Sequence, residues 1–318
     1  MSQELSQQKD PWIVHDGRNG PGRGKHIVFV TGDEEYRSEE ALPMLATIMA
    51  VHHGFKCTVL FAIDPETGLI DPGCQTNIPG LHNLVNADMM VLFTRFRELP
   101  DEQMRYIVDY TESGKPIMGL RTASHAFKYS RDIESPYAKY SFDNDVFEGG
   151  YGRQVLGETW INHHGAHGKE SSRGIVDDRM ADHPILKGVD DIWGPSDVYG
   201  VTTLTGDAKA LVNGQPLVGM EPSDPPNQAK STMPIAWIKS YTGEKGHTSR
   251  VFCTTMGASV DLMSEGLRRL LVNGCYWGME MEDRIAERSR VDFVGEYRPT
   301  FYAVGKYKKG VRPSDLSI

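Results

Sequence analysis

Short apolar runs alternate with amphipathic stretches along the first part of the chain. Residues 38–53 and 100–114 place apolar side chains three or four positions apart, which predicts two helices. Pro43 favours a start for the first helix a few residues after Ser38, because proline fits best in the first turn of a helix. Strands buried on both faces of a sheet are almost continuously apolar, and four runs have this pattern: residues 26–30, 57–62, 89–93 and 116–120.

The same alternation returns late in the chain, where residues 250–255 predict a strand and residues 264–279 predict a helix. Strands that alternate with helices in this way are typical of an α/β fold with a parallel sheet. We therefore expect a flavodoxin-like architecture, with a doubly wound, mostly parallel sheet and helices on both of its faces.

The remaining segments divide the chain into an arm, a domain and a tail. We expect an N-terminal arm over residues 1–24 and an α/β domain over residues 25–284, with a loop-rich insertion at about residues 129–249. Residues 285–318 are expected to form an extended tail that packs on its own domain. Docking of the tail on a second subunit, which would make a homo-oligomer, is the alternative. The tail is too aromatic for a disordered terminus, since it contains Phe293, Tyr297, Phe301, Tyr302 and Tyr307.

Charge and composition exclude several classes of partner. Lys and Arg number 34 against 43 Asp and Glu, a formal net charge of −9, whereas a nucleic-acid-binding surface needs a positive stripe. No stretch approaches the roughly 18 apolar residues of a membrane span. The N-terminal residues lack the apolar stretch of a signal peptide, so we expect a cytoplasmic protein, or an extracytoplasmic one if such a peptide has been removed. The four cysteines are widely spaced, which argues against a cysteine zinc site.

Polar loops follow three of the predicted strands, at residues 31–37, 94–98 and 121–125. Right-handed crossovers place such loops at one edge of a parallel sheet, where α/β proteins bind ligands. We therefore expect a crevice that mixes carboxylates with arginines, although such groups can also pair merely to hold loops in place. The candidates from these loops are Glu35 as a catalytic residue, and Asp33, Glu34, Arg37, Arg95 and Arg97 as substrate-binding residues.

The turn after the strand at 116–120 is the most informative point. A Gly-x-nucleophile turn at the end of a strand projects one side chain into the crevice, and in Gly119-Leu120-Arg121 that position is an arginine. Arginine forms no thioester or acyl intermediate, so the sequence excludes a glutaminase, but arginine can bind a carboxylate, a phosphate or a polarised oxygen. We therefore treat Arg121 and the nearby His125 as catalytic candidates.

Several segments resemble the ThuA-like (trehalose utilisation) family over about residues 26–280. They are the acidic loop after the first strand, Gly119-Leu120-Arg121, Pro234-Ile235-Ala236-Trp237 and Arg250-Val251-Phe252-Cys253-Thr254-Thr255-Met256-Gly257. The resemblance implies a fold akin to the class I glutamine amidotransferase domains and an association with sugar metabolism. Many members of the family carry a histidine where this chain has Arg121, so no role for that position is carried over.

A histidine cluster lies inside the expected insertion. Three of the eleven histidines, His163, His164 and His167, fall within five residues. The flanking glycines indicate a loop, and neighbouring side chains of an extended segment point in opposite directions, so at most two of the three are expected at one site. Histidines suit proton transfer, substrate hydrogen bonding or a divalent metal such as zinc or manganese, and a purely structural role is the remaining alternative. His163 and His164 are the catalytic candidates, His163 and His167 the possible metal ligands, and Glu158, His167, Tyr199 and Met256 the substrate-binding candidates.

Together these features predict an enzyme that acts on a sugar or keto-sugar as a hydrolase, lyase or isomerase. It would use acid/base chemistry, without a cysteine nucleophile and without a firmly indicated cofactor. A non-catalytic carbohydrate-binding or scaffold protein is the first alternative, and a metal-dependent hydrolase is the second. The expected partner is a small carbohydrate, with neither nucleic acid nor membrane involved.

Overall fold

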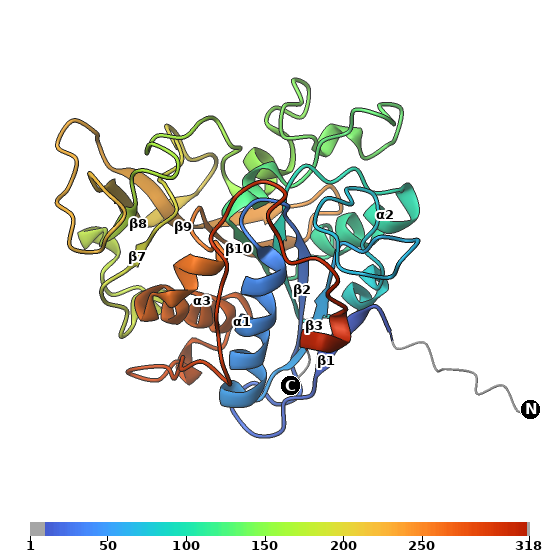
Figure 1. Ribbon diagram of the computed structural model, residues 1–318, viewed down its shortest axis with the longest axis horizontal. Coiled ribbons are helices and arrows are strands. Elements are labelled where there is room, and N and C mark those ends of the chain that lie inside the picture. Colours follow the sequence, from blue (N-terminus) through green and yellow to red (C-terminus); the bar gives the residue numbers. More distant parts are fainter. Residues whose placement is uncertain (1–9, 317–318) are drawn as a thin grey trace, which may run out of the picture.

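The computed structural model describes residues 10–316, and Figure 1 shows helices packed around a central sheet. The described residues contain three α-helices: α1 (Ser38–His53), α2 (Asp101–Thr111) and α3 (Glu265–Gly278). None of these three helices combines the length and the apolarity needed to cross a membrane. The strands of the sheet are β1 (Trp12–His15), β2 (His26–Gly32), β3 (Lys56–Leu60), β4 (Met89–Thr94), β5 (Ile117–Leu120), β6 (Ser172–Val176), β7 (Trp193–Gly194), β8 (Lys209–Pro216), β9 (Met233–Thr242) and β10 (Thr248–Thr254).

The sheet is mixed, in the order β1-β3-β2-β4-β5-β10-β9-β8-β6-β7. One half of the sheet is parallel: each strand pairs in parallel with the next in the order β3, β2, β4, β5 and β10. From β10 onward the pairing is antiparallel through β9, β8, β6 and β7, and β1 pairs antiparallel with β3. The α/β class is therefore confirmed, whereas the expected parallel arrangement holds for one half of the sheet only.

Side chains of the parallel strands alternate between two apolar cores, one on each face of the sheet. On β2, Ile27 and Phe29 belong to the core that also contains residues of α1 and α3. Val28 and Val30 belong to the opposite core, together with residues of α2. Burial on both faces explains why the sequences of these strands are almost continuously apolar.

Helix α1 begins at Ser38, so Pro43 lies inside the helix and the expected later start is wrong. Polar bonds in the preceding loop hold the helix start in place. The Ser38 hydroxyl accepts hydrogen bonds from the amides of Gly32 and Asp33, both at 3.1 Å. The Asp33 carboxylate in turn accepts bonds from two further amides of the loop, at 2.6 and 2.8 Å. The helix start is thereby fixed ahead of the proline.

Two regions that were expected to lack long regular elements contribute strands to the sheet. Residues 12–15, in the expected arm, form β1 and pair with residues 57–60. Strands β6 to β9 lie in the expected insertion and extend the sheet beyond β10. Their sequence pattern is weak because β6 is only five residues long and the pairing of β8 with β9 shifts register around Val212.

The C-terminal tail packs against the domain of its own chain. Figure 1 shows the tail in red, running alongside α1 and over the edge of the sheet. The Tyr297 hydroxyl donates to the carbonyl of Ser259 at 2.8 Å, and the Tyr302 hydroxyl donates to the carbonyl of Pro195 at 2.9 Å. Tyr302 is only 3% exposed, so this part of the tail belongs to the packed domain.

Candidate functional site

The loops that follow β2, β4 and β5 meet at one edge of the sheet. Each contains a non-glycine residue with positive φ: Arg37 (62°), Phe96 (51°) and Arg121 (44°). The loops are also bonded to one another, as the Phe96 amide donates to the carbonyl of His125 at 3.0 Å. Positive φ is costly for residues other than glycine, and such strain concentrates at functional sites. This edge is therefore the candidate site.

Arg121 stands at the turn after β5, but its side chain is fully buried. Its Nη1 donates to the carbonyls of Asp197 (2.6 Å) and Thr255 (2.7 Å). Its Nη2 donates to the Tyr36 hydroxyl (3.0 Å) and to Oδ1 of Asp197 (2.8 Å). The guanidinium also lies 4.3 Å from the ring centre of Tyr36 and 3.7 Å from that of Tyr199. Arg121 is therefore a buried residue that holds Asp197 and Tyr36 in place, and it does not form part of the exposed surface of the site.

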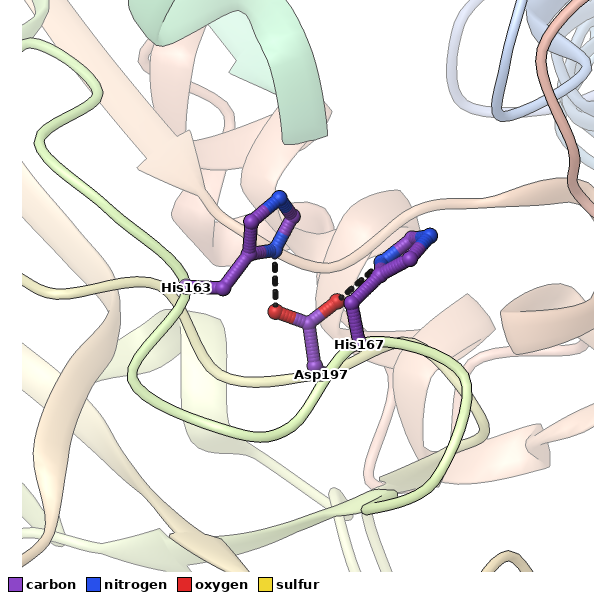
Figure 2. Close-up of side chains that lie close together, drawn as sticks. All are labelled: His163, His167 and Asp197. Atoms are coloured by element: carbon purple, nitrogen blue, oxygen red, sulfur yellow. Dashed lines mark hydrogen bonds and ion pairs between the residues drawn. The ribbon is translucent and has the colours of Figure 1, made fainter.

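Asp197 is the centre of the candidate site, with two histidines on its carboxylate (Figure 2). Nδ1 of His163 lies 2.7 Å from Oδ2 of Asp197, and Nδ1 of His167 lies 3.0 Å from Oδ1. The side chain of Asp197 is fully buried, whereas those of His163 and His167 are 35% and 36% exposed. A buried acid thus holds two imidazoles that solvent can reach.

The backbone around Asp197 explains why two of the three clustered histidines reach it. The amides of His164 and Gly165 both donate to the carbonyl of Val198 at 2.9 Å, which pairs the histidine loop with the segment that follows Asp197. His163 then faces Asp197, and Nε2 of His164 bonds instead to the carbonyl of Ser231 at 2.8 Å. The expected loop conformation is present, because no helix includes the histidine cluster.

The charges in this cluster stabilise one another. Hydrogen bonds to Asp197 and Glu35 raise the pKa of His167 to about 9, so His167 is protonated at neutral pH. Burial alone would raise the pKa of Asp197, but the Arg121 guanidinium and the bonds from His163 and His167 lower it well below its usual value. Asp197 is therefore an anion across the physiological range, and the imidazolium of His167 is a cation at the solvent boundary.

His163 retains one free ring nitrogen. Its Nδ1 lies against the Asp197 carboxylate, which can only accept a hydrogen bond, so Nδ1 carries the proton in the neutral ring. Figure 2 shows Nε2 of His163 pointing away from Asp197, and no group within residues 10–316 bonds to it. A neutral imidazole held in this way presents a lone pair to whatever occupies the site.

Aromatic rings lie close to His163. The ring centre of His163 lies 5.7 Å from that of Trp160 and 5.5 Å from that of Tyr199. Trp160 is partly exposed, and Phe96 and Phe142 are also partly exposed around the nearby ring of His125. The neighbourhood of His163 is therefore rich in aromatic rings, which are tilted against one another.

His125 itself is buried and contributes a neutral ring. Burial lowers its pKa well below the usual value, and the charges of Arg95 and Arg121 lower it further. Its Nδ1 lies 3.1 Å from the Ser124 hydroxyl, and its ring centre lies 5.5 Å from that of Trp160. His125 thus packs behind the aromatic surface and is not itself exposed in the site.

The acidic loop after β2 is tied to arginines of the loop after β4. Glu34 pairs with both Arg95 and Arg97, the latter at 2.9 Å. Glu35 lies 3.3 Å from Arg95 and 3.3 Å from Nε2 of His167, so Glu35 alone among the three acids of this loop reaches the histidine pair. Asp33 is buried and bonds to the Thr122 hydroxyl and to loop amides, which gives it a role in loop structure.

Several of the predicted site residues lie away from the histidine pair. Arg37 is buried and donates to the carbonyls of Glu34 (3.2 Å) and Ala303 (2.5 Å). Glu158 is buried against Arg153 at 2.9 Å. Three further candidates are turned elsewhere: Arg97 donates to the carbonyls of Pro72 and Cys74, His164 bonds to the Ser231 carbonyl, and the buried Met256 packs in the apolar core.

Three residues of the site were not among the sequence candidates: Asp197, Tyr36 and Tyr302. Asp197 lies in the segment without periodicity. Its only sequence signal is its charge, two residues before Tyr199 in Asp197-Val198-Tyr199-Gly200. Tyr36 follows the acidic loop directly, and its hydroxyl bonds to Arg121. The ring of Tyr302 lies 5.3 Å from that of His167, although the two residues are far apart in sequence.

A divalent metal has three candidate ligands in the cluster. His163, His167 and Asp197 each offer one atom, and these atoms lie within 4.8 Å of one another. Two imidazoles and a carboxylate suit zinc. Both carboxylate oxygens already accept bonds from the histidines, however, and the Arg121 guanidinium is 2.8 Å from one of them. A cation would have to replace these bonds, so the donor set fits a metal poorly in this arrangement.

The fold and the site define an α/β protein with a histidine–aspartate centre at the carboxyl edge of its parallel strands. Residues 27–278 match the family ThuA, which is described as trehalose utilisation. The chain therefore belongs to the ThuA family, as its sequence motifs indicated.

Solved structures similar to this chain include two ThuA-like proteins. A ThuA-like protein from Parabacteroides merdae is 13% identical, with a TM-score of 0.51, over 88% of this chain and 97% of that chain. A ThuA-like protein from Bacteroides uniformis is 15% identical, with a TM-score of 0.49, over 82% of this chain and 92% of that chain. The first likeness supports the fold alone, because the identity is low. No curated protein matches the chain.

Proposed function

We propose that this protein is an enzyme that acts on a sugar or keto-sugar by acid/base chemistry, as an isomerase, lyase or hydrolase. One observation carries the proposal: the buried carboxylate of Asp197 binds two solvent-accessible histidines. A carboxylate that orients an imidazole is a recurrent arrangement for proton transfer in enzymes. Membership of a family associated with trehalose utilisation supports a carbohydrate as the substrate.

The two histidines have different roles in this proposal. His163 is the general base, because its Nδ1 is held by Asp197 and its Nε2 lone pair faces the site. His167 is protonated, and it stabilises negative charge that develops on the substrate. Its Nε2 makes only a 3.3 Å contact with Glu35, which a substrate oxygen can replace.

This pair suits a substrate with a carbonyl group. A proton on the carbon next to a carbonyl is acidic because the resulting enolate places its charge on oxygen. His163 removes that proton while His167 stabilises the enolate oxygen. Where the carbon next to the carbonyl carries a hydroxyl, transfer of the hydroxyl proton to the enolate oxygen and return of the abstracted proton from His163 to the former carbonyl carbon give isomerisation. Where the β-carbon carries a substituent, the enolate electrons form a double bond to that carbon and the substituent leaves with the electron pair of its bond, which gives elimination. Neither outcome needs a covalent nucleophile, which agrees with arginine at the turn after β5.

The surroundings of the pair support a sugar ring as the bound group. Trp160 and Phe96 provide partly exposed rings, which bind the apolar faces of sugars. The neighbouring arginine Arg95 is already paired with Glu34 and Glu35, so the site offers few unpaired charges. A neutral carbohydrate fits this balance better than a phosphate ester.

We also infer a fold relationship with the class I glutamine amidotransferase domains. The support is the turn after β5, where Arg121 has a φ of 44° at the position that carries the nucleophile in a Gly-x-nucleophile turn. Under this inference the chain shares the backbone turn with the amidotransferase domains but has an arginine in place of the nucleophile.

Turnover of keto-glycosides and of trehalose by the purified protein tests the proposal. We expect His163→Gln to lower kcat by about 100-fold or more, the usual contribution of a general base. His164→Gln is the matched control, because His164 is adjacent in sequence but bonds to Ser231 outside the site. Equal turnover by His163→Gln and wild type would overturn the assignment. Sugar binding by calorimetry without turnover in the wild type would replace the enzyme with a carbohydrate-binding protein.

A metal-dependent hydrolase is the second candidate function. Ligand atoms from His163, His167 and Asp197 lie within 4.8 Å of one another, but this candidate requires a cation to replace the hydrogen bonds that now join the three side chains. Metal analysis of the purified protein distinguishes it from the metal-free proposal. Stoichiometric zinc or manganese, together with activity lost in a chelator and restored by the metal, would favour this candidate.

A further inference from the structure

The C-terminal tail reaches the candidate site from outside the part of the chain that matches the ThuA family. The family match ends at residue 278, whereas the tail segment that contacts the site spans residues 300–305. Whatever this segment adds to the site therefore lies beyond what the family match covers.

The tail is bonded to the acidic loop after β2 on both sides of Tyr302. The amide of Ala303 donates to the carbonyl of Glu35 at 3.1 Å, and the amide of Gly305 donates to the carbonyl of Glu34 at 2.9 Å. Thr300 bonds through its amide and hydroxyl to the carboxylate of Glu40 in α1, both at 2.7 Å. These bonds fix the position of the tail relative to the acidic loop after β2 and to the start of α1.

Tyr302 connects the tail to His167 and to the segment that carries Asp197. Its hydroxyl donates to the carbonyl of Pro195, two residues before Asp197, at 2.9 Å. Its ring centre lies 5.3 Å from that of His167 and 5.1 Å from that of Tyr36. The rings of Tyr302 and His167 are tilted by 47°, so Tyr302 packs against one side of the imidazole.

We propose that the C-terminal tail is one wall of the active site and that Tyr302 is a positioning residue for His167 and Asp197. This inference rests on the proposed function for its effect on turnover, but its effect on His167 does not. Tyr302 fixes the segment that carries Asp197, and the adjacent tail amides fix Glu35. Loss of Tyr302 therefore loosens both carboxylates that hold His167 and removes one ring that packs on it.

Exposed Phe301 extends this wall. It is 52% exposed and stacks on Tyr302 with ring centres 4.3 Å apart. An exposed aromatic ring that stacks on Tyr302 offers a second flat surface for a sugar, in addition to Trp160. The inference therefore includes Phe301 as a specificity residue that contributes to KM and not to kcat.

The test uses the full chain and four variants of the tail. Tyr302→Leu removes the ring, Tyr302→Phe removes only the bond to Pro195, and Phe301→Ala removes the exposed ring beside it. Tyr307→Phe is the matched control, because Tyr307 lies further along the tail and bonds to Asp71. NMR spectra of the His167 ring at one fixed pH give a readout that needs no substrate. The groups that face this ring are Asp197, Glu35, Tyr36, His163 and Tyr302.

We expect Tyr302→Phe, which keeps the ring, to shift the NMR signals of the His167 ring, because loss of the bond to Pro195 lets the segment that carries Asp197 move. Tyr302→Leu should shift these signals further, since a ring 5.3 Å from that of His167 is also lost, and Tyr307→Phe should leave them unchanged. With an active wild type, Tyr302→Leu should lower kcat about tenfold or more and Phe301→Ala should raise KM severalfold. His167 signals that stay unchanged in Tyr302→Phe would overturn the inference, whether or not turnover is found. Shifted signals in a protein without turnover would keep Tyr302 as a positioning residue while refuting the proposed function.

Discussion

Replacement of Asp197 by asparagine tests the centre of the site directly. The substitution keeps the size of the side chain but removes its charge, so the buried Arg121 loses the carboxylate that lies 2.8 Å away. Removal of one partner from a buried ion pair costs about 3–5 kcal/mol. The amide oxygen of asparagine still accepts one bond from Arg121, so we expect the free energy of unfolding to fall by an amount near the lower end of this range, about 3 kcal/mol.

The same substitution changes the pH dependence of folding through His167. Its pKa of about 9 in the folded protein exceeds the unfolded value of 6.5, so His167 stabilises the fold fully below pH 6.5, and this contribution disappears as the pH rises through 9. A shift of this size corresponds to about 3 kcal/mol at most. The side chain is 36% exposed, and solvent screening reduces the figure to about 1 kcal/mol. Asp197→Asn should therefore destabilise the protein by about 1 kcal/mol more at pH 6 than at pH 9.5.

Urea unfolding at the two pH values measures this difference, and NMR titration of His167 measures its cause. Asp109→Asn is the control, because Asp109 is exposed on α2 and lies 3.8 Å from its partner Lys245. Asp197→Asn should move the pKa of His167 down toward 6.5, since the bond to Asp197 is the largest contribution to its shift. An unchanged His167 pKa, with equal destabilisation at both pH values, would refute the reasoning.

Two further predictions concern buried charges. Neither carboxyl oxygen of Glu39 has a hydrogen-bond partner within residues 10–316, and burial raises its pKa to about 8, so stability should fall as the pH rises from 4.5 to 8. Glu39→Gln should remove most of this fall, so its free energy of unfolding at pH 8 should exceed that of the wild type by about 2 kcal/mol or more. Urea unfolding measures the two free energies, and a difference between the proteins that is the same at pH 4.5 and pH 8 would contradict the prediction. Arg121→Lys should lower stability by about 2–4 kcal/mol, because lysine cannot reach Asp197, Thr255 and Tyr36 together, and an unchanged thermal midpoint would show that the guanidinium geometry is unimportant.

The parallel half of the fold is predictable because its signals are local. An apolar run such as 89–93 and a periodic stretch such as 38–53 can be recognised within a few residues of sequence. The antiparallel half lacks such signals. Gly174 interrupts β6, and the shifted register of β8 breaks its alternation, so the pairing of these strands depends on neighbours distant in sequence.

The site shows the same division between local and distant causes. The position of Arg121 at a turn follows from its neighbours in sequence, but its burial depends on Tyr36 and Tyr199, which come from other segments. The sequence therefore places the guanidinium at the correct edge and predicts contact with substrate where the structure has an internal ion pair. Asp197 escapes prediction because its partners, His163 and His167, are about thirty residues away.

The bond between Arg37 and Ala303 has a consequence for the synthesis of the protein. These residues are 266 positions apart, so the wall formed by the tail cannot assemble until the ribosome has produced residue 303. The early strands and α1 can begin to pack while the chain is still growing, since folding during synthesis proceeds from the N-terminal side. The histidine pair acquires its neighbour Tyr302 only after these earlier elements have been made. Competence of the site thus depends on residues 300–305, and a product that ends before them would lack the wall that holds His167.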